Sequence, residues 1–460
     1  MFSKETYIQR REILKKNFRN GIILLLGNEE CGMNYADNTY HFRQDSTFLY
    51  YFGISVPGLY ALLDIDTGND IIFGNDYTID DIVWMGDMPS VASLAESTGI
   101  KKTAGVGALK HILEKSKQVM FLPPYRPEHQ IKLLQFLGIH PEETTQKASI
   151  PLVVAIAKQR NIKNDEEIIE IEKAVNTTVQ MHKTAMQFAK PGMTEAQVAA
   201  KVTEIALAAG GQLSFPVIAT INGQTLHNHF HGNQIQEGQL FLLDAGAESP
   251  FGYAGDMSST FPVSRTFTPE QRDIYEVCLY AHNSTIEELK PGVHFRDVHL
   301  SAARNIFNGL KSLGFTKGNT EDAVESGAHA LFFPCGLGHL MGLDVHDMEN
   351  LGEQWVGYNG QLKSKQFGLK SLRLAMELQP GNVLTIEPGI YFIPQLIDLW
   401  QKQKINTEFL IFDKINEYRN FSGLRNEVDV LITETGHRVL GEPLPKGVKD
   451  VEAYRVVAFQ

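Results

Sequence analysis

The sequence has few cysteines and no long apolar run, and these absences exclude several classes of protein. Its three cysteines, Cys31, Cys278 and Cys335, are too few and too scattered for a disulfide framework or a structural zinc site. No window approaches 18 consecutive apolar residues, which excludes a membrane-spanning helix. The N-terminal residues are charged and lack the apolar core of a secretory signal. We therefore expect a cytoplasmic protein.

The sequence also lacks an excess of basic residues and the short motifs of several enzyme classes. Lysine and arginine number 42 against 54 acidic residues, and the net charge of −12 argues against a nucleic-acid-binding protein. There is no GxSxG elbow, CxxC pair, HExxH helix or Walker loop. Gly336, Gly338 and Gly342 miss the GxGxxG spacing of a dinucleotide-binding loop.

At 460 residues the chain is too long for one compact core, and its patterning predicts two domains. Residues 1–160 are expected to form an α/β domain with an opening amphipathic helix. The apolar runs that predict its strands cover residues 21–27, 59–66, 69–74 and 119–125. This half contains no catalytic constellation. Residues 161–460 are expected to form the second domain.

Two helices are predicted at the start of the second domain. Asn164 and Glu167 stand at capping-box spacing before a long helix that ends at Pro191, and Thr194 and Gln197 open the next helix in the same way.

The sequence contains a possible internal repeat: segment 189–202 aligns with segment 289–302, which lies 100 residues later. One interpretation is two generic helix pairs. The other is a duplicated α/β half, which would place a site on a pseudo-twofold axis.

Four carboxylates interrupt segments that are otherwise strand-like. Asp244 lies in QLFLLDAGA and Asp256 in GYAGDMSSTF, while Glu387 and Glu427 stand in the middle of VLTIEPGIYF and LRNEVDVLIT. A single such aspartate is more often a turn former, but buried acids are costly unless they are paired or bind a metal. Together with His339 in PCGLGHLMGLDVHD they form an oxygen-rich set that could hold two divalent cations and acidify a water. The pattern predicts metal-assisted hydrolysis.

A run of histidines gives a second candidate site. In LHNHFH, the side chains of His227, His229 and His231 would share one face if the segment is a strand. A three-histidine metal site is one interpretation. A substrate contact by one of the three is the other, and we favour it because the carboxylates already make a complete site.

In their order along the chain, LLDAG, YAGD, GLGHLMGLDVHD, TIEPGIY and LRNEVDVLIT resemble the metallopeptidase family of aminopeptidase P and prolidase. The resemblance covers residues from about 160 to 460 and implies a pita-bread α/β catalytic domain. HFRQDSTFLYYFG (41–53) is similar to the creatinase-type domain that precedes the catalytic domain in aminopeptidase P.

The resemblance implies the roles of the metal ligands. Asp244 would chelate the first metal ion, Asp256 and Glu427 would bridge both ions, and His339 and Glu387 would complete the second. Mn²⁺ is the expected metal because the ligands are mostly oxygens, with Co²⁺, Fe²⁺ or Zn²⁺ as substitutes.

The resemblance also implies catalytic residues. Glu387 would shuttle protons, and His346 and His227 would help hold the developing oxyanion. Arg425 would either orient Glu427 or meet a carboxylate of the substrate. Tyr391 and Cys335 are expected to line the substrate pocket.

The sequence departs from the family pattern at three places. Twelve residues separate Asp244 from Asp256, one more than usual. Cys335 stands where the family usually has a histidine that lines the proline pocket. Residues 353–376 and 393–422 look like insertions near the site, similar to the longer loops of prolidases.

The expected function is hydrolysis of the bond between an N-terminal residue and a penultimate proline, as an Xaa-Pro aminopeptidase. The alternative is an Xaa-Pro dipeptidase that accepts only dipeptides. A non-catalytic peptide-binding or partner-binding module would be expected to have lost several of the five ligands. The family resemblance also implies a homodimer or homotetramer.

Overall fold

The computed structural model describes residues 2–460 and divides them into two units. The first unit runs to Arg160 and includes Met348–Gly352, and the second comprises Asn161–Asp347 and Glu353–Gln460. Within residues 2–460, no helix is both long and apolar enough to cross a membrane.

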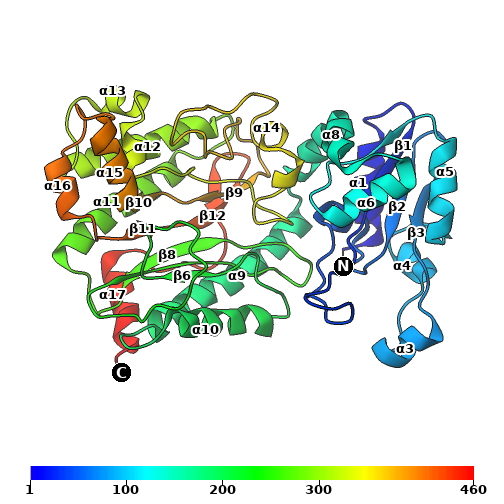
Figure 1. Cartoon of the computed structure of the whole chain (residues 1–460), viewed down its shortest axis with the longest axis horizontal. Helices are drawn as coiled ribbons and strands as arrows, with labels where there is room; N and C mark the ends of the chain where they lie inside the picture. Colours follow the sequence, from blue (N-terminus) through cyan, green and yellow to red (C-terminus); the bar gives the residue numbers. More distant parts are fainter. Residues whose placement is uncertain (1) are drawn as a thin grey trace. The chain divides into compact units, whose positions relative to one another are not determined.

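The first unit contains a mixed five-stranded sheet with the order β4-β3-β2-β1-β5 (Figure 1). Its strands are β1 (Ile22–Leu26), β2 (Tyr60–Asp64), β3 (Asp70–Phe73), β4 (Lys102–Ala104) and β5 (Val119–Met120). Strands β2 and β3 form the predicted hairpin, with Leu63 opposite Asp70. Strand β5 is shorter than predicted, because the Phe121 carbonyl already accepts a hydrogen bond from the Ser149 amide and the chain leaves the sheet there.

Helices surround this sheet. They are α1 (Lys4–Lys15), α2 (Ser46–Phe52), α3 (Ile79–Met85), α4 (Val91–Ser97), α5 (Leu109–Lys115), α6 (Pro127–Leu137), α7 (Thr144–Lys147) and α8 (Ile150–Arg160). The buried face of α1 carries Arg11, whose guanidinium donates to the carbonyls of Tyr51 at 2.9 Å and Thr98 at 2.7 Å and pairs with Asp70. The buried charge is tolerated because its hydrogen-bonding groups are satisfied.

The second unit contains three small antiparallel sheets. Their orders are β6-β7-β8, β13-β12-β9 and β10-β11. The strands are β6 (Ile218–Thr220), β7 (Leu240–Ala245), β8 (Met257–Pro262), β9 (Val383–Ile386), β10 (Gly389–Tyr391), β11 (Gly423–Arg425), β12 (Val428–Ile432) and β13 (His437–Val439).

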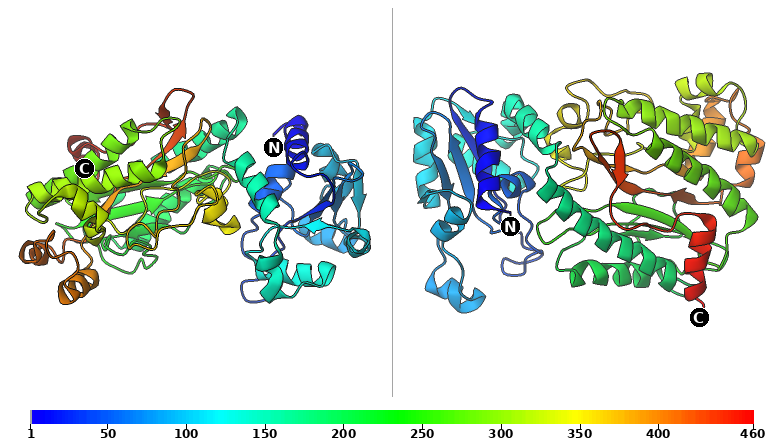
Figure 2. Two further views of the ribbon diagram at one scale, coloured as in Figure 1. Left: turned by 90° about the horizontal axis from the view of Figure 1, so that it is seen from above. Right: turned by 180° about the vertical axis from the view of Figure 1, so that it is seen from behind.

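Long helices cover one face of these sheets, as the right-hand view of Figure 2 shows. The helices of the unit are α9 (Asp165–Phe188), α10 (Glu195–Ala208), α11 (Pro269–Glu287), α12 (Phe295–Ser312), α13 (Thr320–Glu325), α14 (Glu353–Val356), α15 (Pro394–Gln403), α16 (Phe412–Glu417) and α17 (Val448–Val457). The predicted capping boxes form at Asn164 and Thr194. Helix α9 packs on β7 and β8, and α11 packs on β9, β10 and β11.

The two helix pairs are copies of one α/β arrangement. After α9, the Gly192 amide donates to the Ile235 carbonyl at 2.9 Å. After α11, the Gly292 amide donates to the Leu378 carbonyl, also at 2.9 Å. Each helix pair is therefore tied at the same point to the segment that leads into its own strands. The structure supports the duplicated half over two generic helix pairs.

The structure corrects the predicted positions of three carboxylates. Glu387 and Glu427 are not in the middle of strands: Glu387 follows β9, and Glu427 precedes β12. Asp256 likewise precedes β8. At Glu387 the chain passes from β9, which pairs with β12, to β10, which pairs with β11, and Pro388 has no amide hydrogen to continue a ladder. The acids therefore occupy junctions where the strand ladders are interrupted.

Close backbone contact at the end of β7 predicts that Gly246 tolerates no side chain. A Cβ atom there would lie 1.9 Å from the Gly255 carbonyl oxygen, so Gly246→Ala would push apart the segments that carry Asp244 and Asp256. We expect the free energy of unfolding to fall by about 1–3 kcal/mol in chemical denaturation. Gly436→Ala is the control, because open space surrounds its Cβ position. Equal stabilities of the two variants would contradict the prediction.

Candidate metal centre and active site

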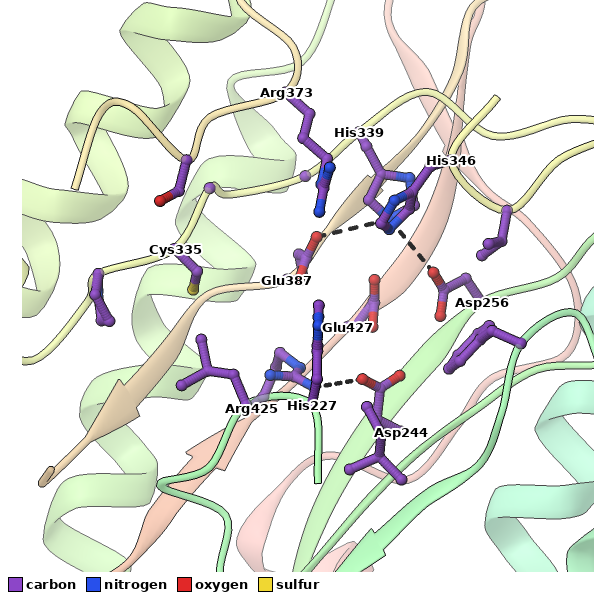
Figure 3. Close-up of a pocket in the computed structure, with 18 of the residues that line it drawn as sticks. His227, Asp244, Asp256, Cys335, His339, His346, Arg373, Glu387, Arg425 and Glu427 are labelled. Atoms are coloured by element: carbon purple, nitrogen blue, oxygen red, sulfur yellow. Dashed lines mark hydrogen bonds and ion pairs between the residues drawn. The ribbon is translucent and has the colours of Figure 1, made fainter. Parts of the chain in front are cut away.

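One cavity of about 600 Å³ in the second unit is lined by nearly all the residues that the sequence predicts for the site. They are Asp244, Asp256, His339, Glu387, Glu427, His227, His346, Arg425 and Cys335. Figure 3 shows the four carboxylates directed toward one another from separate segments. Side chains as far apart in the sequence as His227 and Glu427 thus converge on one space.

Hydrogen bonds between the two copies hold the acids in place. Ser258 lies opposite Asp244 in the β7–β8 hairpin. Its hydroxyl donates to Glu427 Oε2 at 2.8 Å, and its carbonyl accepts from the Glu427 amide at 3.0 Å. The carboxylate of Glu427 is therefore positioned by the strand that follows Asp256.

The His339 ring is oriented with Nε2 toward the acids. Its Nδ1 lies 3.1 Å from the Leu340 carbonyl and donates to it, so Nε2 can act as a metal ligand. Nε2 lies 3.3 Å from Asp256 Oδ2 and 3.7 Å from Glu387 Oε1. The preceding residue must be glycine, because a Cβ atom on Gly338 would lie 2.0 Å from the Thr385 carbonyl.

The carboxylates carry more negative charge than the protein compensates. Burial raises the pKa of Asp256 and Glu427 well above the ordinary values, and neighbouring carboxylates raise both further. Burial also raises the pKa of Glu387. Asp256 Oδ1 is buried and finds no hydrogen-bond partner among the described residues. A cluster of this kind is costly unless cations complete it.

Divalent metal ions fit this set of donors. Asp256, His339 and Glu427 each offer a ligand atom, and these atoms lie within 4.8 Å of one another. Asp244 and Glu387 lie on the same cavity and add two more carboxylates. Carboxylate oxygens with one imidazole suit hard or intermediate divalent ions.

Arg425 lies beneath the acids and supplies a permanent positive charge. Its guanidinium pairs with Asp244 and donates to the Ser258 hydroxyl and the Tyr391 hydroxyl, each at 2.8 Å. This network corrects the expected position of Tyr391. The tyrosine is fully buried behind Arg425 and does not line the cavity, because its hydroxyl is used to hold the guanidinium.

The histidine run does not form a three-histidine face. Residues 226–233 adopt no strand, so the three rings do not share a side. His227 and His229 line the cavity, whereas His231 Nε2 lies 3.0 Å from the Val217 carbonyl. The His346 ring also lines the cavity, 4.1 Å from the His339 ring between centroids. Burial lowers the pKa of His227, and the Arg425 charge lowers it further.

The cavity is also lined by residues that the sequence did not predict, among them three from one loop. Phe367, Ser371 and Arg373 all come from the segment interpreted as an insertion near the site. Figure 3 shows Arg373 reaching toward Glu387 from the opposite side to Arg425. The sequence offered no signal for them, because a lone arginine in an irregular loop is indistinguishable from a surface residue.

Buried Asp429 and half-buried Lys446 lie behind the acids and were not predicted from the sequence. Asp429 Oδ2 accepts from the Asp256 amide at 3.0 Å, and Lys446 Nζ donates to the Glu427 carbonyl at 2.8 Å. Burial lowers the pKa of Lys446 to about 8. Asp429 is a second acid in the same apolar strand segment as Glu427, two residues away, and nothing in the sequence assigned it a separate role.

Comparison with known proteins identifies the family of the chain. The family model described as metallopeptidase family M24 matches residues 170–434, and the model of the aminopeptidase P N-terminal domain matches residues 7–131. The chain belongs to metallopeptidase family M24. The predicted family and its pita-bread fold are confirmed, and the chain is related to divalent-metal hydrolases.

Relatives in this family carry two kinds of name. Human Xaa-Pro dipeptidase is 30% identical over 457 residues, covering 96% of this chain and 90% of the relative. A probable Xaa-Pro aminopeptidase of Fusarium vanettenii is 30% identical over 441 residues, covering 94% and 92%. Among solved structures, zinc-substituted Escherichia coli aminopeptidase P in complex with product has a TM-score of 0.82 at 26% identity, with 99% of each chain covered.

The uncompensated charge predicts that metal ions stabilise the M24 unit. Saturating Mn²⁺ added to chelator-treated protein should raise Tm, since a ligand at 100 times its Kd adds about 2.7 kcal/mol. Asp256→Asn should raise the Tm of the metal-free protein, because it removes one repelling charge, but it should abolish most of the rise caused by Mn²⁺. Differential scanning calorimetry measures both. An unchanged response to Mn²⁺ in this variant would show that Asp256 is no ligand.

Proposed function

We propose that this chain is an Xaa-Pro aminopeptidase, which hydrolyses the bond between an N-terminal residue and a penultimate proline. The observation that carries the proposal is the convergence of four carboxylates and His339 on one cavity. The names of the relatives and of the structural neighbour support proline as the substrate residue. The proposal includes a cytoplasmic location and a homodimer or homotetramer, which stay predictions.

The proposed cofactor is a pair of divalent cations, with Mn²⁺ favoured by the oxygen-rich ligands. Asp244, Asp256, His339, Glu387 and Glu427 would hold them. When bound, such ions polarise a carbonyl and lower the pKa of water, so that peptide hydrolysis proceeds near neutral pH.

The protein groups around the ions would supply positioning and proton transfer. Glu387 would take a proton during attack on the scissile carbonyl and return it to the proline nitrogen as the bond breaks. His346 and His227, which both line the cavity, would donate hydrogen bonds to the developing oxyanion. Arg425 would hold the Asp244 carboxylate in its orientation through their ion pair.

A second candidate is an Xaa-Pro dipeptidase, and Arg373 favours it. The side chain lines the cavity and is 30% exposed, and it pairs with Glu353 at 3.3 Å through Nη1. Its charge also acts on Glu387 and His227. A proline at the end of a dipeptide carries a carboxylate that a guanidinium can bind through two hydrogen bonds. In a longer peptide the same position carries an uncharged amide.

A comparison of substrates separates the two candidates. With Mn²⁺ present, we expect cleavage of Ala-Pro and Ala-Pro-Ala but not of Ala-Ala-Ala, and loss of all cleavage in Glu427→Ala. If Arg373 binds a terminal carboxylate, Arg373→Met should raise KM about 10-fold or more for Ala-Pro, the loss expected for a charged hydrogen-bonded pair. The KM for Ala-Pro-Ala should change little.

The outcome decides the assignment. Efficient turnover of Ala-Pro-Ala supports the aminopeptidase, and turnover restricted to Ala-Pro supports the dipeptidase. A preference for Ala-Ala-Ala would reject both.

Cys335 is the residue that departs from the family pattern in the cavity. Burial raises the pKa of its thiol to about 12, and the Glu387 charge raises it further, so the side chain stays neutral. A thiol is a weak hydrogen-bond donor, whereas an imidazole donates or accepts strongly. The wall formed by Cys335 is therefore smaller and less polar than a histidine would make it.

Cys335→His should change the KM for proline substrates by about 2- to 10-fold, the effect of one hydrogen bond of about 0.5–1.5 kcal/mol. We expect KM to fall, because the imidazole adds a hydrogen-bonding group to the pocket. Steady-state kinetics on Ala-Pro-Ala measures it, with Cys31→Ser as a control for loss of an exposed thiol. If neither kinetic constant changes, Cys335 does not contact the substrate.

A further inference from the structure

A buried ion pair outside the set of site residues lies directly behind the loop that carries His346. Lys163 Nζ is 2.8 Å from Asp347 Oδ2, and both side chains are only 1% exposed. Taking two charges out of water is costly, and their attraction repays that cost only when their geometry is good. A pair of this kind is weak evidence for stability, and its use in fixing one conformation is the alternative to test.

The lysine is tied to the strand that follows Glu427. The Lys163 amide donates to the Gly381 carbonyl at 2.9 Å, and the Gly381 amide donates to the Ile432 carbonyl at 2.9 Å. Ile432 is the last residue of β12. The backbone of Lys163 is therefore held to β12 through Gly381, and this fixes the origin of its side chain.

The aspartate is tied to the cavity loop. Residues 341–347 contain neither helix nor strand, so no regular ladder holds His346. The Asp347 amide donates to the Leu340 carbonyl at 2.9 Å, and its Oδ1 accepts from the Asp344 amide at 3.4 Å. The backbone of Asp347 thus joins the two ends of the loop, its side chain bonds to Asp344 within the loop, and Lys163 links that side chain to the sheet.

The loop is shaped around this pair. A Cβ atom on Gly342 would lie 2.6 Å from Asp347 Oδ2 and 3.0 Å from Lys163 Cε. The backbone therefore approaches both charged groups as closely as a glycine permits. Because the Gly342 backbone packs directly against Asp347 and Lys163, loss of the ion pair would shift the backbone of the loop.

We propose that Lys163 is a positioning residue, which acts through Asp347 to hold the His346 imidazole on the cavity wall beside His339. Lys163 touches no substrate and lies outside the sequence motifs of the site. This inference rests on the proposed function, in which His346 contacts the reacting carbonyl. A positioning role differs from a purely structural one because the effect of Lys163 on turnover would depend on His346 alone.

The test uses the Mn²⁺-loaded full chain and Ala-Pro-Ala. Lys163→Met should lower kcat about 10- to 100-fold, the range for partners that orient active-site groups, with a smaller change in KM and unchanged bound Mn²⁺. Lys183→Met is the matched control, because it removes an ion pair of 3.2 Å with the exposed Glu442 and should leave kcat unchanged. Asp347→Asn keeps the shape of the side chain and serves if Lys163→Met does not fold.

A double-mutant cycle separates positioning from general damage. In a His346→Ala background, Lys163→Met should cause no further loss of kcat, because the group through which it acts is gone. Losses that multiply in the double variant, or an unchanged kcat in the folded single variants, would overturn the proposal.

A spectroscopic arm is independent of activity. In metal-free protein with ¹³C-labelled histidine, the His346 ring signal, assigned from His346→Ala, should shift in Lys163→Met and Asp347→Asn and not in Lys183→Met. An unshifted signal would overturn the proposal even if the wild type cleaved no proline peptide. An inactive wild type with a shifted signal would instead reject the proposed function alone.

Discussion

Buried negative charge is the constraint on which the M24 unit of this protein depends. Asp256, Glu387 and Glu427 face one another in a space where burial raises the pKa of each, and Asp256 has a buried oxygen with no protein partner among the described residues. The protein compensates only part of this charge, through Arg425 and Lys446. Bound metal ions would neutralise the remaining negative charge, so metal binding would also stabilise the folded unit.

The duplicated architecture makes such a cluster feasible. Each helix pair is tied to its own strands by the same hydrogen bond, and the copies meet where the chain passes between small sheets. At these junctions the ladders are interrupted, so Asp256, Glu387 and Glu427 can project into one cavity without breaking a continuous sheet. Ser258 joins the copies by bonding to both Arg425 and Glu427.

Two arginines on opposite sides of the cavity, Arg425 and Arg373, supply its positive charge. Arg425 is fully engaged with Asp244, Ser258 and Tyr391, so its charge serves the acids. Arg373 lies on the opposite wall, where it is partly exposed, pairs with Glu353 at 3.3 Å and also acts on Glu387 and His227 by its charge. The human Xaa-Pro dipeptidase and the probable Xaa-Pro aminopeptidase of Fusarium vanettenii are both 30% identical to this chain, so overall identity does not separate the two activities.

The sequence by itself determined the family, the class of fold and the residues that meet at the centre. Capping boxes at Asn164 and Thr194 were predictable because they are local, and the acids stood out because carboxylates in apolar runs are costly. The tertiary structure decided everything that depends on distant segments. It moved Glu387 and Glu427 from strand interiors to junctions, buried Tyr391 behind Arg425, and brought Arg373 and the Lys163–Asp347 pair to the site. Those contacts join residues far apart in sequence and leave no periodic or motif signal, so only the folded chain could reveal them.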